Sequence, residues 1–126
     1  MDLIRSDELA GTVPYAYAAI ARGLVFAAGA CPLDGSGQVV GPGDVPAQAE
    51  QVMANLVAAL RAAGAELTDV TKTTVYVAST ERADLGAAWE VVRRWFGDHD
   101  APSTLLGVTV LGYPGQLVEV EAIAAI

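Results

Sequence analysis

The chain has 126 residues, of which 53% are hydrophobic, and carries a formal net charge of −8 with only seven Lys and Arg. This length fits one domain spanning residues 1–126. The shortage of cations argues against nucleic acid or an anionic membrane surface as a partner, and a single cysteine excludes an internal disulfide and a cysteine-based zinc site.

The sequence also predicts where the protein is located. No run reaches the roughly 20 apolar residues of a membrane span, and the N-terminus lacks the basic start and apolar run of a signal peptide. We therefore expect a cytoplasmic protein that does not enter a membrane.

The high apolar share has two explanations: a composition with 24 alanines, or a buried subunit interface, which resembles a core cut in half.

The first half of the chain predicts a hairpin and a helix. Residues 18–30 form two short strands broken at Arg22-Gly23, and a loop rich in Gly, Pro and Asp covers 31–44. Residues 45–64 have a proline near the start and a glycine at the end, as helices do. One apolar stripe follows this helix at Val52, Leu56, Leu60 and Ala63.

The second half predicts a strand, a helix and two more strands. Residues 69–79 alternate and are rich in β-branched side chains. A helix over 80–97 has Thr80 as its expected N-cap. Its apolar stripe comprises Leu85, Trp89, Val92 and Phe96. Two strands over 103–112 and 117–126 close the chain, and a further strand is expected near 3–6.

The predicted order β-β-α-β-α-β-β gives an α+β fold. Two helices cannot cover both faces of such a sheet, so we expect both on one face. The other face then needs cover from another subunit, which favours an oligomer.

Few side chains in this sequence carry chemistry. Cys31 ends a predicted strand, and no feature of the sequence ties it to His99, the only histidine, so a structural cysteine is favoured over a nucleophile. His99 lies in a polar loop, where no metal site is expected. Glu119 and Glu121 point to the same side of the last strand. They fit either a solvated pair or a carboxylate in a subunit cleft.

Several stretches together resemble the RidA (YjgF-like) family. They are "VPYAYAAIARGLVFAAGACPLD", "QAEQVMANLVAALRAAGAELTDVTKTTVYVAS" and "LVEVEAIAAI", and the similarity runs from about residue 13 to 126. The resemblance implies a chorismate-mutase-like fold, a mixed sheet with two helices on one face, assembled as a homotrimer with clefts between subunits. It also implies an enamine/imine deaminase that hydrolyses 2-iminoalkanoates without metal or organic cofactor.

Three positions match the family's cleft, and three others depart from it. The resemblance implies that Tyr15 and Gly29 line the substrate pocket and that the catalytic Glu119 positions the attacking water. The family's substrate-binding arginine aligns with Ser103. The serine before the cleft glycine is replaced by Ala28, and an asparagine of the second helix aligns with Trp89, which fits the helix core equally well.

The missing arginine changes the expected substrate. A carboxylate placed 4 Å from Glu119 without a cation meets a repulsion of about 4 kcal/mol at an effective dielectric of 20. Arg5, Arg22 or Arg93 of a neighbouring subunit are the available replacements. We otherwise expect a neutral or cationic small molecule, stacked on Trp89 and bonded to Glu119.

Three functions therefore stay open. The first is a divergent imine or enamine hydrolase with a substrate other than the usual 2-iminoalkanoate. The second is a non-catalytic small-molecule-binding trimer. The third is an enzyme of another reaction type, such as a cyclisation or dehydration in secondary metabolism, with Glu119 as acid or base.

Overall fold

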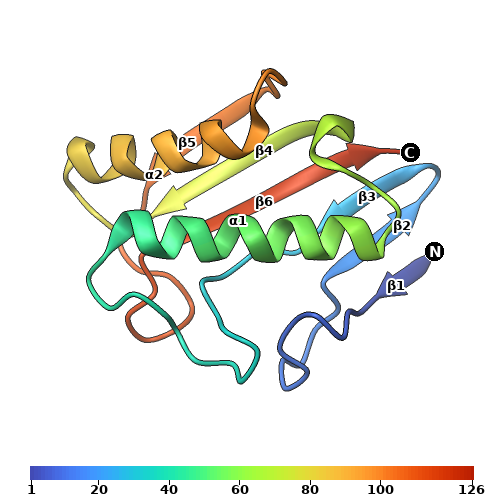
Figure 1. Ribbon diagram of the computed structural model, residues 1–126, viewed down its shortest axis with the longest axis horizontal. Helices are drawn as coiled ribbons and strands as arrows, with labels where there is room; N and C mark the ends of the chain where they lie inside the picture. Colours follow the sequence, from blue (N-terminus) through green and yellow to red (C-terminus); the bar gives the residue numbers. More distant parts are fainter.

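The computed structural model describes all residues, 1–126, as one six-stranded sheet covered by two helices (Figure 1). The strands are β1 (Asp2–Ile4), β2 (Ala18–Ala21), β3 (Leu24–Ala27), β4 (Val70–Val77), β5 (Ser103–Gly107) and β6 (Val118–Ala125). The helices are α1 (Val45–Ala62) and α2 (Arg82–Phe96), with a short 3-10 helix, η1, at Leu67–Asp69. The strand order is β1-β2-β3-β6-β4-β5. Only β4 and β5 are parallel, so the sheet is mixed as predicted.

Both helices lie on the same face of the sheet, which confirms the expected α+β architecture (Figure 1). Helix α1 begins after Asp44, whose Oδ1 accepts a hydrogen bond from the backbone N–H of Ala47. The predicted stripe of α1 is buried against the sheet at Val52, Leu56, Leu60 and Ala63.

The start of α2 differs from the prediction. Its N-cap is Glu81, one residue after Thr80, and Glu81 makes no side-chain cap. Ser79 Oγ instead accepts a hydrogen bond from the N–H of Glu81 and donates to Asp84. Ser79 thus orders the entry to α2 without accepting a hydrogen bond from the N–H groups of the helix itself.

Strand β6 lies between β3 and β4 and alternates as its sequence predicts. Its core-facing side chains are buried at Val118, Val120, Ala122 and Ala124. Glu119 and Glu121 point to the opposite face, which no helix covers. Exposed apolar side chains on the same open face include Leu24, Phe26 and Leu106.

The strand expected over 103–112 is shorter than predicted. It ends at Gly107, where an added β-carbon would lie 2.8 Å from the carbonyl oxygen of Ser79. The chain then leaves the sheet as a loop over 108–117. No helix of the chain has the length and apolar character needed to cross a membrane.

Candidate functional site

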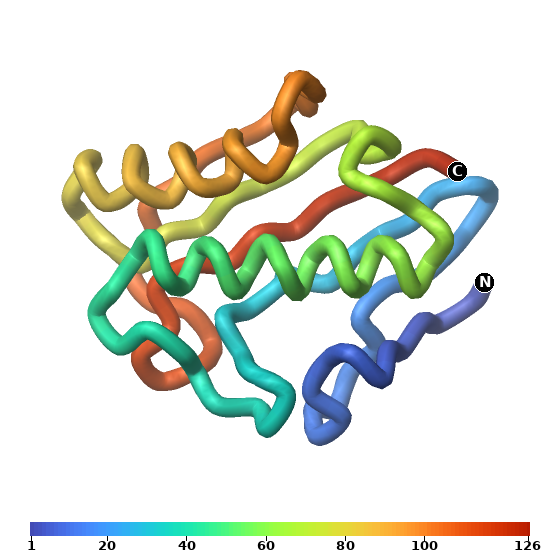
Figure 2. Tube along the Cα trace, in the orientation of Figure 1, coloured from blue at the N-terminus to red at the C-terminus, as the bar shows by residue number.

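Three loops meet at one end of the sheet and bring distant residues together (Figure 2). They cover residues 5–17, 28–44 and 108–117. The second loop runs beside β6, since the backbones of Ala30 and Val120 exchange hydrogen bonds. This pairing places Gly29 and Cys31 next to the carboxylate of Glu119.

Glu119 is held through one of its two carboxylate oxygens. Its Oε1 accepts hydrogen bonds from Gln116 Nε2 at 3.1 Å and from Cys31 Sγ at 3.4 Å. Its Oε2 accepts none from the protein and occupies the space that a β-carbon on Gly29 would fill. The chain has one ion pair, Arg94 with Glu50, so Glu119 has no cationic partner.

Cys31 is a buried thiol in this arrangement. Burial and the neighbouring negative charge of Glu119 raise the pKa of Cys31 to about 12. The residue is therefore protonated at neutral pH and serves as a hydrogen-bond donor. A nucleophilic role would need the thiolate.

A pair of tyrosines closes the same region. The hydroxyls of Tyr15 and Tyr113 lie 3.0 Å apart, and Tyr15 packs edge-on against Tyr17. Burial, together with the bond to Tyr113, raises the pKa of Tyr15 far above its ordinary value. Tyr15 is thus a neutral phenol that donates or accepts one hydrogen bond.

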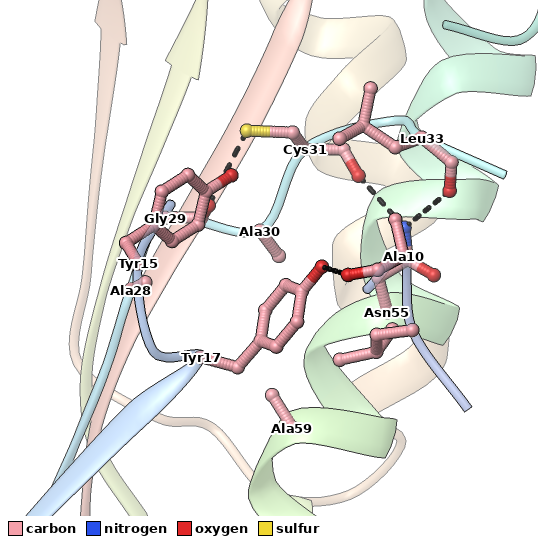
Figure 3. A pocket seen from close by; sticks show the side chains of 11 residues that line it. Ala10, Tyr15, Tyr17, Ala28, Gly29, Ala30, Cys31, Leu33, Asn55 and Ala59 are labelled. Carbon is pink, nitrogen blue, oxygen red and sulfur yellow. Dashed lines mark hydrogen bonds between the residues drawn. The ribbon is translucent and has the colours of Figure 1, made fainter. Parts of the chain in front are cut away.

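Side-chain amides of α1 hold the loops in place, and Figure 3 shows the one of Asn55. Asn55 Nδ2 donates to the carbonyl oxygens of Cys31 and Leu33 at 2.8 and 2.9 Å. Gln48, fully buried, bonds to Gly115 and Leu117 of the third loop. A cavity of about 20 Å³ beneath Tyr15 and Cys31 has room for one water, so a larger ligand has to bind outside it.

Trp89 and Ser103 lie elsewhere. Both line a depression of about 80 Å³ on the helix-covered side, together with Arg93. Ser103 Oγ accepts a hydrogen bond from the fully buried Thr73 on that side. Within one chain the structure therefore does not bring Trp89 or Ser103 to Glu119.

The arginines named as replacements have separate positions. Arg5 Nη1 donates to the backbone carbonyl of Tyr15 at 2.9 Å. Arg22 lies in the β2–β3 turn with a positive φ of 52°. Neither makes a hydrogen bond or ion pair with Glu119.

Glu121 has its own partner on the open face. Tyr76 Oη donates to Glu121 Oε1 at 2.6 Å, and this bond raises the pKa of Tyr76. The two carboxylates of β6 thus have different surroundings. Glu119 faces Gln116 and Cys31, while Glu121 is bonded to a phenol.

Sequence reasoning missed Gln116 and Tyr113. Both belong to the 108–117 loop, where no periodicity marks a side chain as inward-facing. No group of three or more His, Cys, Asp or Glu is placed to hold a metal ion. His99 instead bonds to the carbonyl of Val70 at 2.8 Å.

Comparisons with known proteins show what the whole chain is similar to. A family model described as Endoribonuclease L-PSP matches residues 5–126. A RutC family protein of Pyrococcus horikoshii is 36% identical, covering 88% of this chain and 86% of the relative. The 2-iminobutanoate/2-iminopropanoate deaminase of Rattus norvegicus is 34% identical, covering 87% of this chain and 78% of that enzyme.

Solved structures share the whole fold. RidA from an Antarctic Psychrobacter superposes with a TM-score of 0.87 at 27% identity, covering all of both chains. TdcF of E. coli, solved with bound serine, gives 0.84 at 27% identity, covering 100% of this chain and 99% of that one.

Proposed function

Because the chain belongs to the Endoribonuclease L-PSP (RidA/YjgF-like) family, we propose that it hydrolyses imines or enamines without a metal or organic cofactor. Two related proteins of similar length, from Rattus norvegicus and Capra hircus, are named 2-iminobutanoate/2-iminopropanoate deaminases. The observation that carries the proposal is the carboxylate of Glu119. It is fixed through Oε1, free of protein donors at Oε2, and unpaired with any cation.

This geometry suits general base catalysis of water addition. Glu119 Oε2 takes a proton from water as the water oxygen bonds to the carbon of the C=N group and the π electrons move to nitrogen. The protonated Glu119 passes this proton to the nitrogen, which gives a carbinolamine and restores the carboxylate. The carboxylate then moves the hydroxyl proton to the nitrogen as the C–N bond breaks, and ammonia and a carbonyl compound are the products.

The charge around Glu119 sets the substrate class. A 2-iminoalkanoate brings a carboxylate, and no cation near Glu119 in this chain offsets the resulting repulsion. An imine without a carboxylate avoids that repulsion, and its protonated iminium form is attracted to Glu119. We therefore assign a neutral or cationic imine to this site.

The assembly belongs to the same proposal. The open sheet face carries exposed Leu24, Phe26 and Leu106 beside Glu119 and Glu121, as expected of a face covered by neighbouring subunits. We propose a homotrimer with a cleft at each interface, in which a neighbour's Trp89, Ser103 or arginine lies within reach of Tyr15, Gly29 and Glu119. Light scattering after size exclusion tests this, and a monomeric mass contradicts it.

Two other functions fit less well. The family description names an endoribonuclease, but a net charge of −8 with seven Lys and Arg opposes binding to RNA phosphates. A purely small-molecule-binding trimer needs no carboxylate with a free oxygen. A cyclase or dehydratase using Glu119 as acid or base remains the second candidate.

The deciding experiment compares two imines made in situ. An amino-acid oxidase acting on alanine supplies 2-iminopropanoate, and an amine oxidase acting on a primary amine supplies an imine without a carboxylate. Release of ammonia is followed with the wild type, Glu119→Gln and Glu121→Gln. We expect faster hydrolysis of the carboxylate-free imine, a loss of at least about 10²-fold in Glu119→Gln, and retained activity in Glu121→Gln.

Three outcomes contradict the proposal. Preference for 2-iminopropanoate overturns the substrate class. Equal rates for the wild type and Glu119→Gln overturn the role of Glu119. No acceleration of either imine overturns hydrolysis and leaves binding or another reaction.

A further inference from the structure

We propose that Gln116 is the positioning residue of Glu119: with Cys31 it holds Oε1, so that Oε2 alone is presented as the base. The inference rests on the proposed function, since a base matters only if this site performs proton transfer. Nothing in the sequence pattern marks Gln116, and its contacts carry the argument.

Gln116 is 4% exposed, and both ends of its amide are hydrogen-bonded. Nε2 donates to the carbonyl oxygen of Val118 and to Glu119 Oε1, both at 3.1 Å. Oε1 of Gln116 accepts a hydrogen bond from the backbone N–H of Tyr113 at 3.1 Å. The bond to Val118 fixes one N–H of the amide, and this leaves the other aimed at Glu119.

If Gln116 only stabilised the 108–117 loop, two of its three hydrogen bonds would be enough. The bonds to Tyr113 and Val118 already join the loop to the start of β6. The third bond goes to a carboxylate and is charge-assisted, which makes it the strongest of the three. Gln116 therefore acts on Glu119 directly as well as on the loop.

The two oxygens of Glu119 thereby differ. Oε1 accepts from Gln116 and lies 3.4 Å from the Cys31 thiol, which shares its one proton between Oε1 and the carbonyl oxygen of Gly29, and these donors lower the basicity of Oε1. Oε2 lies over Gly29 and has no protein donor. A water or an iminium bonded to Glu119 therefore has Oε2 as its acceptor.

Gln116 also connects Glu119 to the tyrosine pair. Its acceptor oxygen fixes Tyr113, whose hydroxyl lies 3.0 Å from that of Tyr15. A change at residue 116 consequently disturbs both the base and the phenols beside it.

The kinetic test is a double-mutant cycle between Gln116→Met and Glu119→Gln. Methionine keeps the length of glutamine and removes all three hydrogen bonds. We expect Gln116→Met to lower kcat by about 10²-fold, as a misplaced catalytic group does, with a smaller change in KM. In the Glu119→Gln background the same change should cost almost nothing further, because its effect runs through Glu119.

The matched control is Gln48→Met. Gln48 is also a buried glutamine that clips the 108–117 loop, but it does not contact Glu119. We expect it to lower the free energy of unfolding comparably and to change kcat by the same factor in both backgrounds. An equal loss of kcat from Gln116→Met with and without Glu119 overturns the positioning role.

A spectroscopic readout needs no substrate. The chain has a single cysteine, so its infrared S–H stretch comes from Cys31 alone, whose Sγ lies 3.4 Å from both Glu119 Oε1 and the carbonyl oxygen of Gly29. Glu119→Gln and Gln116→Met should move this band toward the position of a weaker hydrogen bond, and Gln48→Met should leave it in place. An unshifted band in Gln116→Met overturns the proposal.

The two readouts separate the two proposals. If no imine is hydrolysed but the band shifts as expected, the hydrolase function fails and the positioning of Glu119 by Gln116 stands. If imines are hydrolysed but the effects of Gln116→Met and Glu119→Gln on kcat are additive and the S–H band does not shift, the hydrolase function stands and this inference fails.

Discussion

The carboxylate of Glu119 lies where the side chain of residue 29 would be. A β-carbon on Gly29 would come within 2.9 Å of Glu119 Cγ and overlap the carboxylate itself. The backbone of Gly29 has no positive φ, so glycine is required there by its neighbour and by no turn. Gly29 and Glu119 are in this sense one structural unit.

Gly29→Ala should therefore lower the rate of imine hydrolysis more strongly than it lowers the free energy of unfolding. The overlap is relieved by rotating Glu119, which breaks its bonds to Gln116 and Cys31. We expect imine hydrolysis to fall about 10²-fold, with a loss of about 1–2 kcal/mol in the free energy of unfolding. Assays of ammonia release and urea unfolding measure the two effects. Full activity in Gly29→Ala would show that the observed position of Glu119 is not the working one.

Gly86→Ala is the same substitution at a position with open surroundings, where we expect it to stabilise the fold. Gly86 is an exposed residue inside α2, and nothing lies within 4 Å of an added β-carbon. Alanine should raise the free energy of unfolding by about 0.5–1 kcal/mol through helix propensity. Urea unfolding checks this, and imine hydrolysis should not change. A destabilised Gly86→Ala would contradict the open surroundings of this position.

Cys31 should make the protein sensitive to alkali. Its ordinary pKa of 9.0 rises to about 12 in the folded chain, so its contribution to stability is complete below pH 9 and is lost as pH rises from 9 to 12. The slope approaches about 1.4 kcal/mol per pH unit. Tyr15, Tyr17 and Tyr76, whose pKa values are also raised from 10.0, begin to add to this loss near pH 10, equally in the wild type and in variants of Cys31.

The measurement is urea unfolding at pH 8, 9 and 10. The thiol alone should cost the wild type about 1.4 kcal/mol across this range, and Cys31→Ser, which keeps a donor toward Glu119, should lose less. Parallel curves for the two proteins would show that the thiol is not the titrating group.

Asn55 should stabilise the loop that carries Cys31. Asn55→Ala removes the side-chain donor of both carbonyls, and only that of Cys31 keeps another donor, the backbone N–H of Leu33. We expect a loss of about 2 kcal/mol in the free energy of unfolding. Gln51→Ala removes only the donor to Asn55 Oδ1 and should cost under about 1 kcal/mol. Urea denaturation distinguishes the two, and equal losses would contradict the assignment.

Helices and strands with a strong apolar period could be predicted from the sequence. Val52, Leu56 and Leu60 recur at helical spacing and are buried where expected, because burial of a stripe is a local property of the pattern. The strand that begins at residue 103 is shorter than predicted. The prediction extends it because Val108 to Val110 alternate as strand residues do. The close approach of Gly107 to Ser79, a tertiary contact, ends it early.

The candidate site could be predicted only in part. The resemblance named Tyr15, Gly29 and Glu119, and these lie in one region. Trp89 and Ser103 face the helix side, which for Trp89 is one of the two placements that the sequence left open. Gln116 depends on side-chain hydrogen bonds between a loop and a strand, for which the sequence contains no periodic signal.

The alternation of β6 has a consequence for folding fidelity. Side chains along a strand have a period of two, so a slip of one residue would turn Glu119 and Glu121 into the core and expel Val118 and Val120. An unpaired carboxylate in an apolar interior costs several kcal/mol. The two glutamates therefore make any register shift of β6 by an odd number of residues unfavourable. The residue proposed to act on substrate thus also helps select the correct fold.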